Sequence, residues 1–230
     1  MSDIIKHECG IVLLRLRKSL QYYIDKYKTP SYAVNKMYLL MQKQLNRGQD
    51  GVGVANIKID MEPGYRYISR YRTIDSQPIQ TIFHKIGRKY QKALKEGEEK
   101  FLDGSWLKQN IAFSGEVWMG HLRYGTHGKN SIENCHPFLR QNNWRSRNLV
   151  VAGNFNMTNS KELFENLVEI GQHPKEYTDT VIIMEEIGHF LDNSVRKIRK
   201  DLKKIELSKD EITEKISKKL DLFKILRKAS

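Results

Sequence analysis

The segment at residues 51–59, GVGVANIKI, limits the possible fold more than any other part of this chain. Its apolar and small residues alternate with a period of two, which predicts a β-strand, and its glycines permit another backbone to approach closely. Further strands are expected after Cys9 and at residues 117–126 and 148–153. Strands and helices that alternate in this way predict stacked sheets covered by helices. The expected helices are residues 31–48, closed by Gly48, residues 159–170, capped by Asn159 or Ser160, and residues 179–191. Residues 77–110 are expected to be helix and loop.

The formal charge of +13 is distributed unevenly along the 230 residues. Residues 193–230 hold thirteen Lys and Arg against six Asp and Glu, so this tail carries +7 of the excess. Its apolar residues recur mostly at helical spacing, which predicts one or two amphipathic helices that pack on the body or on a further domain. A phosphate-binding surface is the alternative, but the tail lacks a series of base-stacking aromatic residues, so we expect no nucleic acid partner.

The apolar segments of this sequence are short. None approaches the roughly 18 uninterrupted apolar residues of a membrane helix, and residues 1–8, MSDIIKHE, lack the basic start and apolar centre of a secretory signal. Only two cysteines, Cys9 and Cys135, are present, so a disulfide framework is not expected. These features favour a soluble, cytoplasmic protein without a membrane partner.

Cys9 lies at the head of the first apolar run and has three possible roles. It could be a small buried hydrophobe, which is the common state of a lone cysteine at the start of a strand. It could be a nucleophile activated by its own α-amine, which titrates near ~7.7 to 8.0, if residues 1–8 were removed. It could also be a metal ligand beside His7. However, neither the H-x-C pair nor the adjacent Cys135 and His136 has the spacing of a structural zinc site, so no metal is expected.

Five separated segments resemble, in order, the class II glutamine amidotransferase domain, most closely that of the amidophosphoribosyltransferases. They are HECGI, LNRGQDGVGVA, GHLRYGTHGKNSIENCHPF, VVAGNFNMTN and TDTVIIMEEI. The resemblance implies an α+β fold of the N-terminal-nucleophile hydrolase type, a four-layer αββα sandwich, over residues 9–192. It also implies that residues 1–8 are a propeptide removed by self-processing, and that residues 193–230 form a helical tail leading to a missing region.

The resemblance assigns roles to individual residues. Cys9 corresponds to the nucleophile and Arg47 to an arginine that organises the site, although alone Arg47 would be expected to contact the last carbonyls of a helix. Arg123 corresponds to the arginine that binds the substrate carboxylate, because a planar guanidinium can engage both oxygens. Asp179 corresponds to the acid that receives the substrate ammonium, but in isolation it would be expected to cap a helix; both roles can coexist. Thr126 and His127 are expected to add a hydroxyl and a backbone or ring contact.

The implied oxyanion hole departs from the family pattern. An Asn-Gly pair usually supplies a side-chain amide and a backbone N–H, and one such donor contributes ~2.7 to 4 kcal/mol. Here the pair is Ala152-Gly153, so Gly153 can offer its N–H while Ala152 has no amide. The sequence leaves open whether Asn154, the next residue, replaces it. Cys135 and Pro137 in NCHPF are expected to be structural.

The resemblance implies hydrolysis of glutamine to glutamate and ammonia, without a cofactor in this domain. Ammonia would pass to a phosphoribosyl pyrophosphate site in purine biosynthesis, on a phosphoribosyltransferase domain or subunit that is missing here. We expect a homo-oligomer at full length. The alternatives are the glutaminase half of another amidotransferase, such as glucosamine-6-phosphate synthase or asparagine synthetase, and a glutamine-binding regulatory module with low turnover.

Overall fold

The computed structural model describes residues 8–125, 131–202, 207 and 209–229. The chain forms two compact units. The first unit comprises residues up to Pro137 together with Ala152–Asn154, and the second comprises Phe138–Val151 and Phe155 onward. Both units combine helices with antiparallel strands, which confirms the predicted α+β class. The four-layer sandwich remains a prediction.

The first unit is built on a four-stranded antiparallel sheet in the order β1-β4-β2-β3. Its strands are β1 (Gly10–Arg15), β2 (Gly51–Ile57), β3 (Ile68–Thr73) and β4 (Val117–Arg123). The alternation predicted for residues 51–59 is confirmed in β2. Val52 and Val54 point into the core, and Gly51 and Gly53 lie on the opposite face. Val52 is opposite Leu122 of β4, so buried side chains are aligned across the strands.

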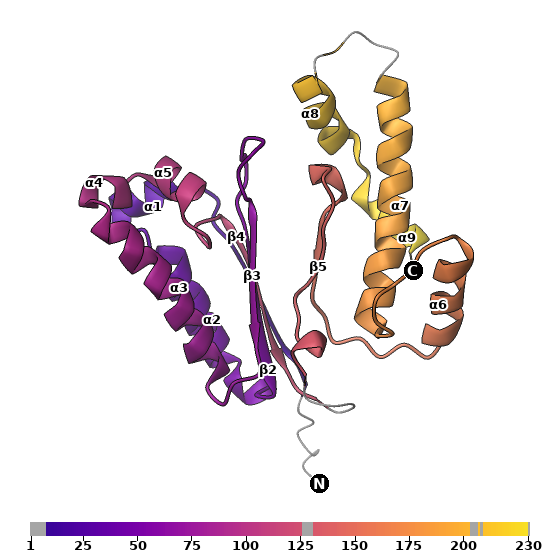
Figure 1. Ribbon diagram of the computed structural model, residues 1–230, viewed down its shortest axis with the longest axis horizontal. Helices are drawn as coiled ribbons and strands as arrows, with labels where there is room; N and C mark the ends of the chain where they lie inside the picture. The colour runs from indigo at the N-terminus through magenta and orange to yellow at the C-terminus, as the bar shows by residue number, and fades with distance from the viewer. Residues whose placement is uncertain (1–7, 126–130, 203–206, 208, 230) are drawn as a thin grey trace. The chain divides into compact units, whose positions relative to one another are not determined.

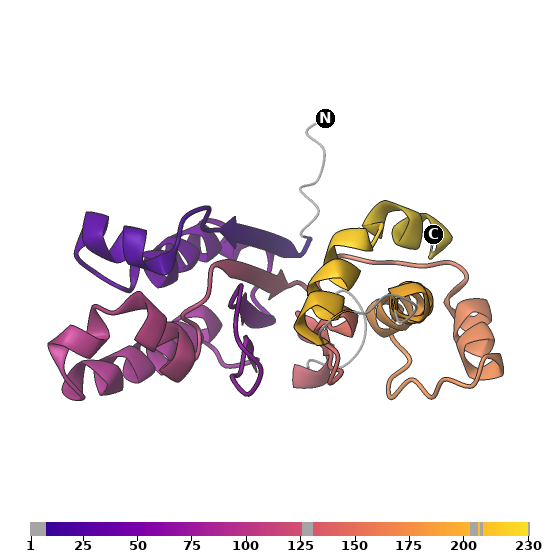
Figure 2. The same cartoon turned by 90° about the horizontal axis from the view of Figure 1, so that it is seen from above.

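Helices cover one face of this sheet (Figures 1 and 2). The two long ones, α2 (Tyr32–Lys43) and α3 (Pro78–Lys95), contact the strands, and three shorter ones are α1 (Leu20–Tyr27), α4 (Glu98–Phe101) and α5 (Gly104–Asn110). Apolar side chains recur every three or four residues on α3 and pack on the sheet, while its other face is polar. The core between these layers includes Met37, Met41, Ile79, Ile82, Ile86, Trp118 and Leu122.

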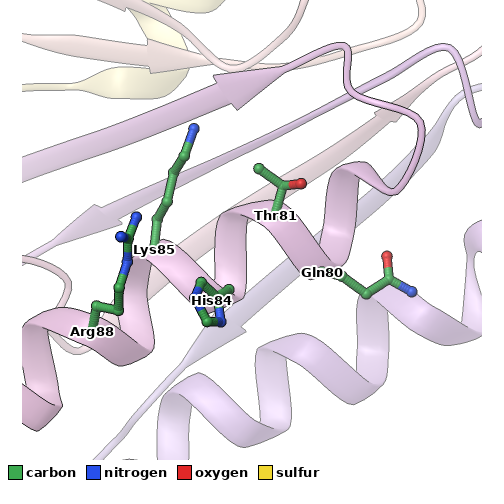
Figure 3. A pocket seen from close by; sticks show the side chains of 5 residues that line it. All are labelled: Gln80, Thr81, His84, Lys85 and Arg88. Carbon is green, nitrogen blue, oxygen red and sulfur yellow. The ribbon is translucent and has the colours of Figure 1, made fainter.

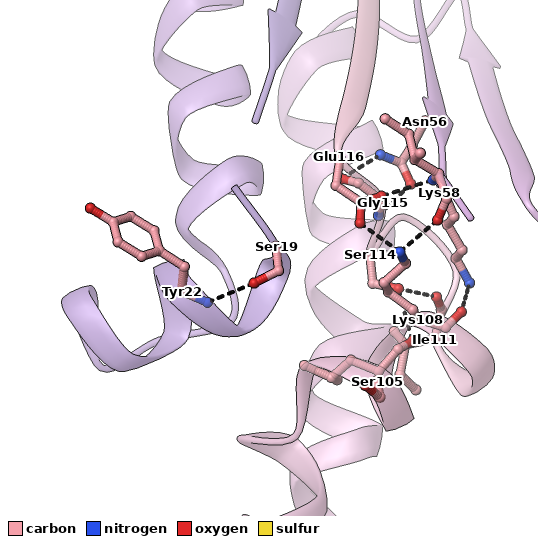
Figure 4. A network of polar contacts seen from close by, with 12 residues as sticks. Ser19, Tyr22, Asn56, Lys58, Ser105, Lys108, Ile111, Ser114, Gly115 and Glu116 are labelled. Carbon is pink, nitrogen blue, oxygen red and sulfur yellow. Dashed lines mark hydrogen bonds and ion pairs between the residues drawn. The ribbon is translucent and has the colours of Figure 1, made fainter. Parts of the chain in front are cut away.

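A polar network closes the end of this core at the start of β4 (Figure 4). The buried Asn56 side chain accepts from Gly115 N–H at 2.8 Å and donates to the Gly115 and Val117 carbonyls. Lys108 Nζ lies 2.6 Å from the Glu116 carboxylate, and Lys58 Nζ donates to the Lys108 carbonyl. These buried groups satisfy one another, as polar atoms removed from water must.

The opposite face of the sheet is crossed by residues 131–137. Arg72 of β3 donates to the carbonyls of Glu133 and Cys135 at 3.1 and 2.9 Å. A side chain at Gly51 would collide with Cys135 Sγ, and one at Gly53 would collide with the His136 carbonyl. The glycines of β2 therefore permit the close approach that the sequence predicts. The crossing segment contains the 3₁₀ turn Ile132–Asn134 and a cis peptide between His136 and Pro137.

Gly48 differs from its predicted role as a helix cap. α2 ends at Lys43, a 3₁₀ turn follows at Leu45–Arg47, and Gly48 is extended with φ of −162°. Any residue can adopt this φ, so backbone conformation does not require glycine here. Space does, because a Cβ at Gly48 would lie 2.6 Å from the Arg123 carbonyl carbon and oxygen.

The second unit is mainly helical. Its strands β5 (Phe138–Arg140) and β6 (Leu149–Val151) form a short antiparallel pair, and its helices are α6 (Ser160–Glu169), α7 (Asp179–Leu202), α8 (Lys209–Lys219) and α9 (Leu222–Lys228). A 3₁₀ turn at Arg145–Arg147 links the two strands. The tail predicted from residue 193 begins inside α7, which continues through that position without a break. Its amphipathic character is confirmed, because Val195, Leu202, Ile216 and Ile225 form a core with Leu191.

Arg140 anchors α7 to this strand pair. Its guanidinium contacts Glu185 at 3.0 Å and Asp192 at 2.7 Å. Gly188 lies between these acids on α7, and a side chain there would collide with the Arg140 guanidinium. None of the described helices has the length and apolar character needed to cross a membrane.

Candidate active site

Cys9 lies immediately before β1, and its side chain is half-buried. The Tyr124 N–H donates to Cys9 Sγ at 3.4 Å, and the thiol lies 3.8 Å from the Tyr124 carbonyl oxygen. These residues are 115 positions apart in the chain and meet because β1 pairs with β4, with Gly10 opposite Leu122. The structure therefore places a backbone N–H donor against the Cys9 sulfur.

Arg47 lies beside the start of β1. A Cβ built on Gly10 would be 3.4 Å from Arg47 Cβ, and the Arg47 guanidinium is 3.7 Å from the Glu8 carboxylate. Both side chains of this ion pair are about half exposed, so the pair adds at most about 1 kcal/mol to stability. The structure therefore brings Arg47 next to the Glu8–Cys9 peptide.

Arg123 is the last residue of β4 and is buried, with 8% of its surface exposed. It lies opposite Gly51 and directly precedes Tyr124, so the strand that contacts Cys9 also carries this arginine. Its positive charge adds to burial in lowering the pKa of His136. Thr126 and His127 lie outside the described residues.

Gly153 belongs to the first unit, in the short segment Ala152–Asn154 that separates the two stretches of chain that make up the second unit. Its N–H, predicted to serve the oxyanion hole, donates to His136 Nδ1 at 3.3 Å. Burial lowers the pKa of His136 to about 4, so the ring is neutral near pH 7 and can accept this bond. Asn154 follows with an exposed side chain. The only oxyanion donor expected from the Ala152-Gly153 pair is thus bonded to a histidine.

Two further residues near this centre were not predicted from the sequence. His121 is buried on β4, its ring 4.3 Å from that of His136, and neither of its nitrogens has a hydrogen-bond partner among the described residues. Burial, followed by the charge of His136, lowers the pKa of His121 to about 3. Asp50 accepts from Gly125 N–H at 2.7 Å. Its place in RGQDG, two residues after Gly48, is the one signal that could have drawn attention to it.

Asp179 begins α7 in the second unit. One carboxylate oxygen accepts from Met157 N–H at 2.9 Å, while Thr178 Oγ1 accepts from Val181 N–H at 3.3 Å. A side-chain oxygen that accepts from an N–H three residues later is the contact of an N-cap. The interpretation of Asp179 as the cap is therefore wrong: Thr178 caps α7, and Asp179 ties the start of α7 to the loop that precedes α6.

Two other features of the described residues bear on possible chemistry, metal-binding side chains and a pocket on α3. Within residues 8–125, 131–202, 207 and 209–229, no three His, Cys, Asp or Glu residues are grouped so that they could hold a metal ion. A pocket on α3 is lined by Gln80, Thr81, His84, Lys85 and Arg88 (Figure 3). All five come from one helix, so this pocket is separate from the Cys9 centre.

No protein-family model matches the chain. Several curated proteins do. The chain is 34% identical over 121 residues to a glutamine–fructose-6-phosphate aminotransferase of Sulfurisphaera tokodaii, which covers 53% of this chain and 19% of that protein. It is 32% identical over 96 residues to an amidophosphoribosyltransferase of Methanocaldococcus jannaschii, and this match covers 42% of this chain and 18% of that protein. It is 32% identical over 111 residues to human glutamine–fructose-6-phosphate aminotransferase 2, and this match covers 46% of this chain and 16% of that protein.

The chain thus spans about a fifth of the length of the curated relatives it matches. Both kinds of relative are class II glutamine amidotransferases. The resemblance carried by the five sequence segments is therefore confirmed: over about half its length, this chain is a relative of the class II glutamine amidotransferases.

Proposed function

We propose that this chain is a glutaminase domain that hydrolyses glutamine to glutamate and ammonia at Cys9. The observation that carries the proposal is the position of Cys9 Sγ, 3.4 Å from the Tyr124 N–H, at the end of the strand that carries Arg123. The thiol is half-buried, so a substrate can reach it, and a backbone N–H donor lies beside it. The relationship to glutamine amidotransferases supports the choice of substrate.

The proposed chemistry begins with removal of residues 1–8, which frees the α-amine of Cys9. This amine takes the thiol proton, and the thiolate attacks the side-chain amide carbon of glutamine. The carbon–nitrogen bond then breaks, and the α-ammonium returns its proton to the departing ammonia. Water gives a proton to the amine as it attacks the thioester, which releases glutamate and restores the thiol.

Four residues are proposed to recognise glutamine. Arg123 binds the α-carboxylate, Asp179 binds the α-ammonium, and Thr126 and His127 contribute a hydroxyl and a further contact. Asp179 already accepts the Met157 N–H with one oxygen, so its other carboxylate oxygen is the one proposed for substrate. Arg47 is proposed to orient the peptide before Cys9 during self-processing, since its guanidinium contacts Glu8.

The proposed acceptor of ammonia is a phosphoribosyl pyrophosphate site, as in an amidophosphoribosyltransferase of purine biosynthesis. That site would lie on a partner domain or subunit beyond the tail of residues 193–230, in a cytoplasmic homo-oligomer. Transfer to fructose 6-phosphate is a second candidate, because glutamine–fructose-6-phosphate aminotransferases match this chain at similar identity. Adding each acceptor domain in turn and assaying ammonia transfer distinguishes them.

A glutamine-binding module with low turnover is also supported by a specific observation. Ala152 lacks the amide of the usual oxyanion hole, and the Gly153 N–H is bonded to His136. Losing one oxyanion donor lowers turnover roughly 10² to 10³-fold while substrate binding is retained. Measuring glutamine affinity and glutamate release on the same protein separates this module from a full glutaminase.

Intact-mass analysis with 6-diazo-5-oxo-norleucine tests the proposal directly. We expect loss of residues 1–8 and a single adduct on Cys9, together with glutamate release that Cys9→Ala abolishes. Folded protein that retains residues 1–8 and leaves Cys9 unmodified would refute the mechanism for that form. Glutamate release by Cys9→Ala at the wild-type rate would refute it for every form.

A further inference from the structure

Asp50 contacts the end of β4 at two points. Its backbone N–H donates to the Arg123 carbonyl at 3.0 Å, and its carboxylate accepts from the Gly125 N–H at 2.7 Å. The second contact is short for an N–H···O bond, as expected when the acceptor is ionised. One residue therefore holds the backbone on both sides of Tyr124.

Tyr124 is the residue whose backbone faces the nucleophile. Its N–H lies 3.4 Å from Cys9 Sγ and its carbonyl oxygen lies 3.8 Å from it. Hydrogen-bond strength falls steeply as the donor angle departs from linearity, so a rotation of this peptide would remove the donor from the sulfur. Because Asp50 restrains residues 123 and 125, it restrains the peptide between them.

The loop that carries Asp50 fits closely against the same strand end. A Cβ at Gly48 would clash with the Arg123 carbonyl, so only glycine lets the loop reach this position. A Cβ built on Gly125 would lie 3.4 Å from both the Asp50 carboxylate and the Arg123 guanidinium. The carboxylate and the guanidinium thus flank the same residue of the turn.

We propose that Asp50 is a positioning residue for Cys9: its carboxylate fixes the turn at residues 123–125 so that the Tyr124 N–H points at the sulfur. This inference rests on the proposed role of Cys9 as nucleophile. Asp50 itself does not touch the thiol in this arrangement and acts through the backbone of Tyr124. Its effect is on the reactivity of Cys9 and on turnover, rather than on glutamine binding.

The test compares four variants of the full chain. Asp50→Ala and Asp50→Ser remove the acceptor, because a serine hydroxyl is too short to reach the Gly125 N–H. Asp50→Asn keeps an oxygen at the right distance. Asp75→Asn is the matched control, since Asp75 is an exposed acid in the same unit whose contact with Thr73 Oγ1 is made by its backbone N–H.

The readouts are the rate of Cys9 alkylation by iodoacetamide from pH 6 to 9, kcat and KM for glutamine, and the melting temperature. We expect Asp50→Ala and Asp50→Ser to slow alkylation at pH 7 about 5- to 10-fold and to lower kcat with little change in KM. Asp50→Asn should recover at least half of the wild-type rate, and Asp75→Asn should match wild type.

Wild-type alkylation rates in folded Asp50→Ala or Asp50→Ser overturn the inference, and so does failure of both variants to fold, since Asp50 would then be structural. Alkylation needs no glutamine, so it separates this inference from the proposed function. A wild-type protein without glutaminase activity whose Cys9 alkylation still depends on Asp50 contradicts only the proposed function. Slowed turnover with unchanged alkylation contradicts only the positioning role.

Discussion

The two cysteines of this chain occupy contrasting surroundings within one unit. Cys9 is half-buried, and a backbone N–H is directed at its sulfur. Cys135 is fully buried, and its sulfur lies near two carbonyl oxygens, those of Thr73 at 3.9 Å and Ser131 at 3.7 Å. Burial raises the pKa of Cys135, although the charges of Arg123 and Arg72 partly offset this. The same side chain therefore meets a hydrogen-bond donor at a partly exposed position in one case and carbonyl oxygens in the core in the other.

This contrast has a structural origin. Cys9 lies just before an edge strand, and its side chain is partly exposed. Cys135 lies in the segment that crosses the opposite face of the sheet, against Gly51 of β2. Solvent access and hydrogen-bond donors, which control the reactivity of a cysteine thiol, therefore differ between Cys9 and Cys135.

The largest expected effect comes from removing each sulfur in turn. Cys9→Ala should lower glutamate release by roughly 10³-fold or more, because the proposed mechanism forms its thioester on the Cys9 sulfur. Cys135→Ala should change it by less than about threefold, since that thiol fills space. Coupled detection of glutamate measures both, with melting temperatures as the control for folding. Equal losses in the two variants would remove the distinction between the cysteines.

Chemical labelling should also distinguish Cys9 from Cys135, with a ratio of labelling rates somewhat smaller than the difference in activity between the two alanine variants. At pH 7 in native buffer, we expect iodoacetamide to modify Cys9 at least about 100-fold faster than Cys135, because Cys135 is buried and its pKa is raised. Peptide mass spectrometry after timed quenching gives both rates. In guanidinium chloride the two rates should converge. Native labelling of Cys135 at a rate similar to that of Cys9 would contradict its buried position.

Gly51→Ala should act on the Cys135 side by steric pressure. The new methyl group would collide with Cys135 Sγ, and overpacking of this kind costs about 1–3 kcal/mol of unfolding free energy. In combination with Cys135→Ala, which removes the colliding atom, the cost should be smaller than the sum of the two single changes by about 0.5 kcal/mol or more. Urea unfolding of the four proteins in this cycle measures the coupling. Strict additivity would show that the two residues do not collide.

Acid should destabilise the segment that contains Cys135 and His136. The pKa of His136 is about 4 in the folded protein because of burial, against about 6.5 in the unfolded chain. Stability from this group is therefore complete above pH 6.5 and declines as pH falls toward 4, because only the unfolded state takes up the proton. We expect a loss of about 1–2 kcal/mol over that range.

Denaturant unfolding at pH 7.5, 6.5, 5.5 and 4.5 measures this dependence. His136→Asn keeps an acceptor near the position of Nδ1 and cannot be protonated, so its stability should fall less steeply. Some slope should remain, because the pKa of His121 is also lowered by burial. An unchanged slope in His136→Asn would show that the His136 ring does not resist protonation in the folded state.

Local sequence patterns predicted the elements whose periodicity is strong. The alternation in GVGVANIKI and the expected strands at residues 117–126 and 148–153 correspond to β2, β4 and β6. β3 was not predicted, because ISRYRT places arginines on one face and depends on residues 131–137 to receive them. Gly48 and Asp179 were misinterpreted for a similar reason. Each resembles a helix cap locally. In the structure, Gly48 instead lies close to the Arg123 carbonyl, and the Asp179 carboxylate accepts from the Met157 N–H.

The sequence by itself determined the α+β class and the close approach permitted by the glycines of β2, because periodicity is a local property. Its resemblance to a family supplied the candidate residues Cys9, Arg47, Arg123 and Asp179. Only the tertiary structure decided that Tyr124 faces the sulfur of Cys9, that Asp50 holds that turn, and that His136 accepts the Gly153 N–H. These contacts join residues 17 to 115 positions apart, and strand pairing creates them. Hydrogen bonds depend on distance and direction in space, which no local pattern encodes.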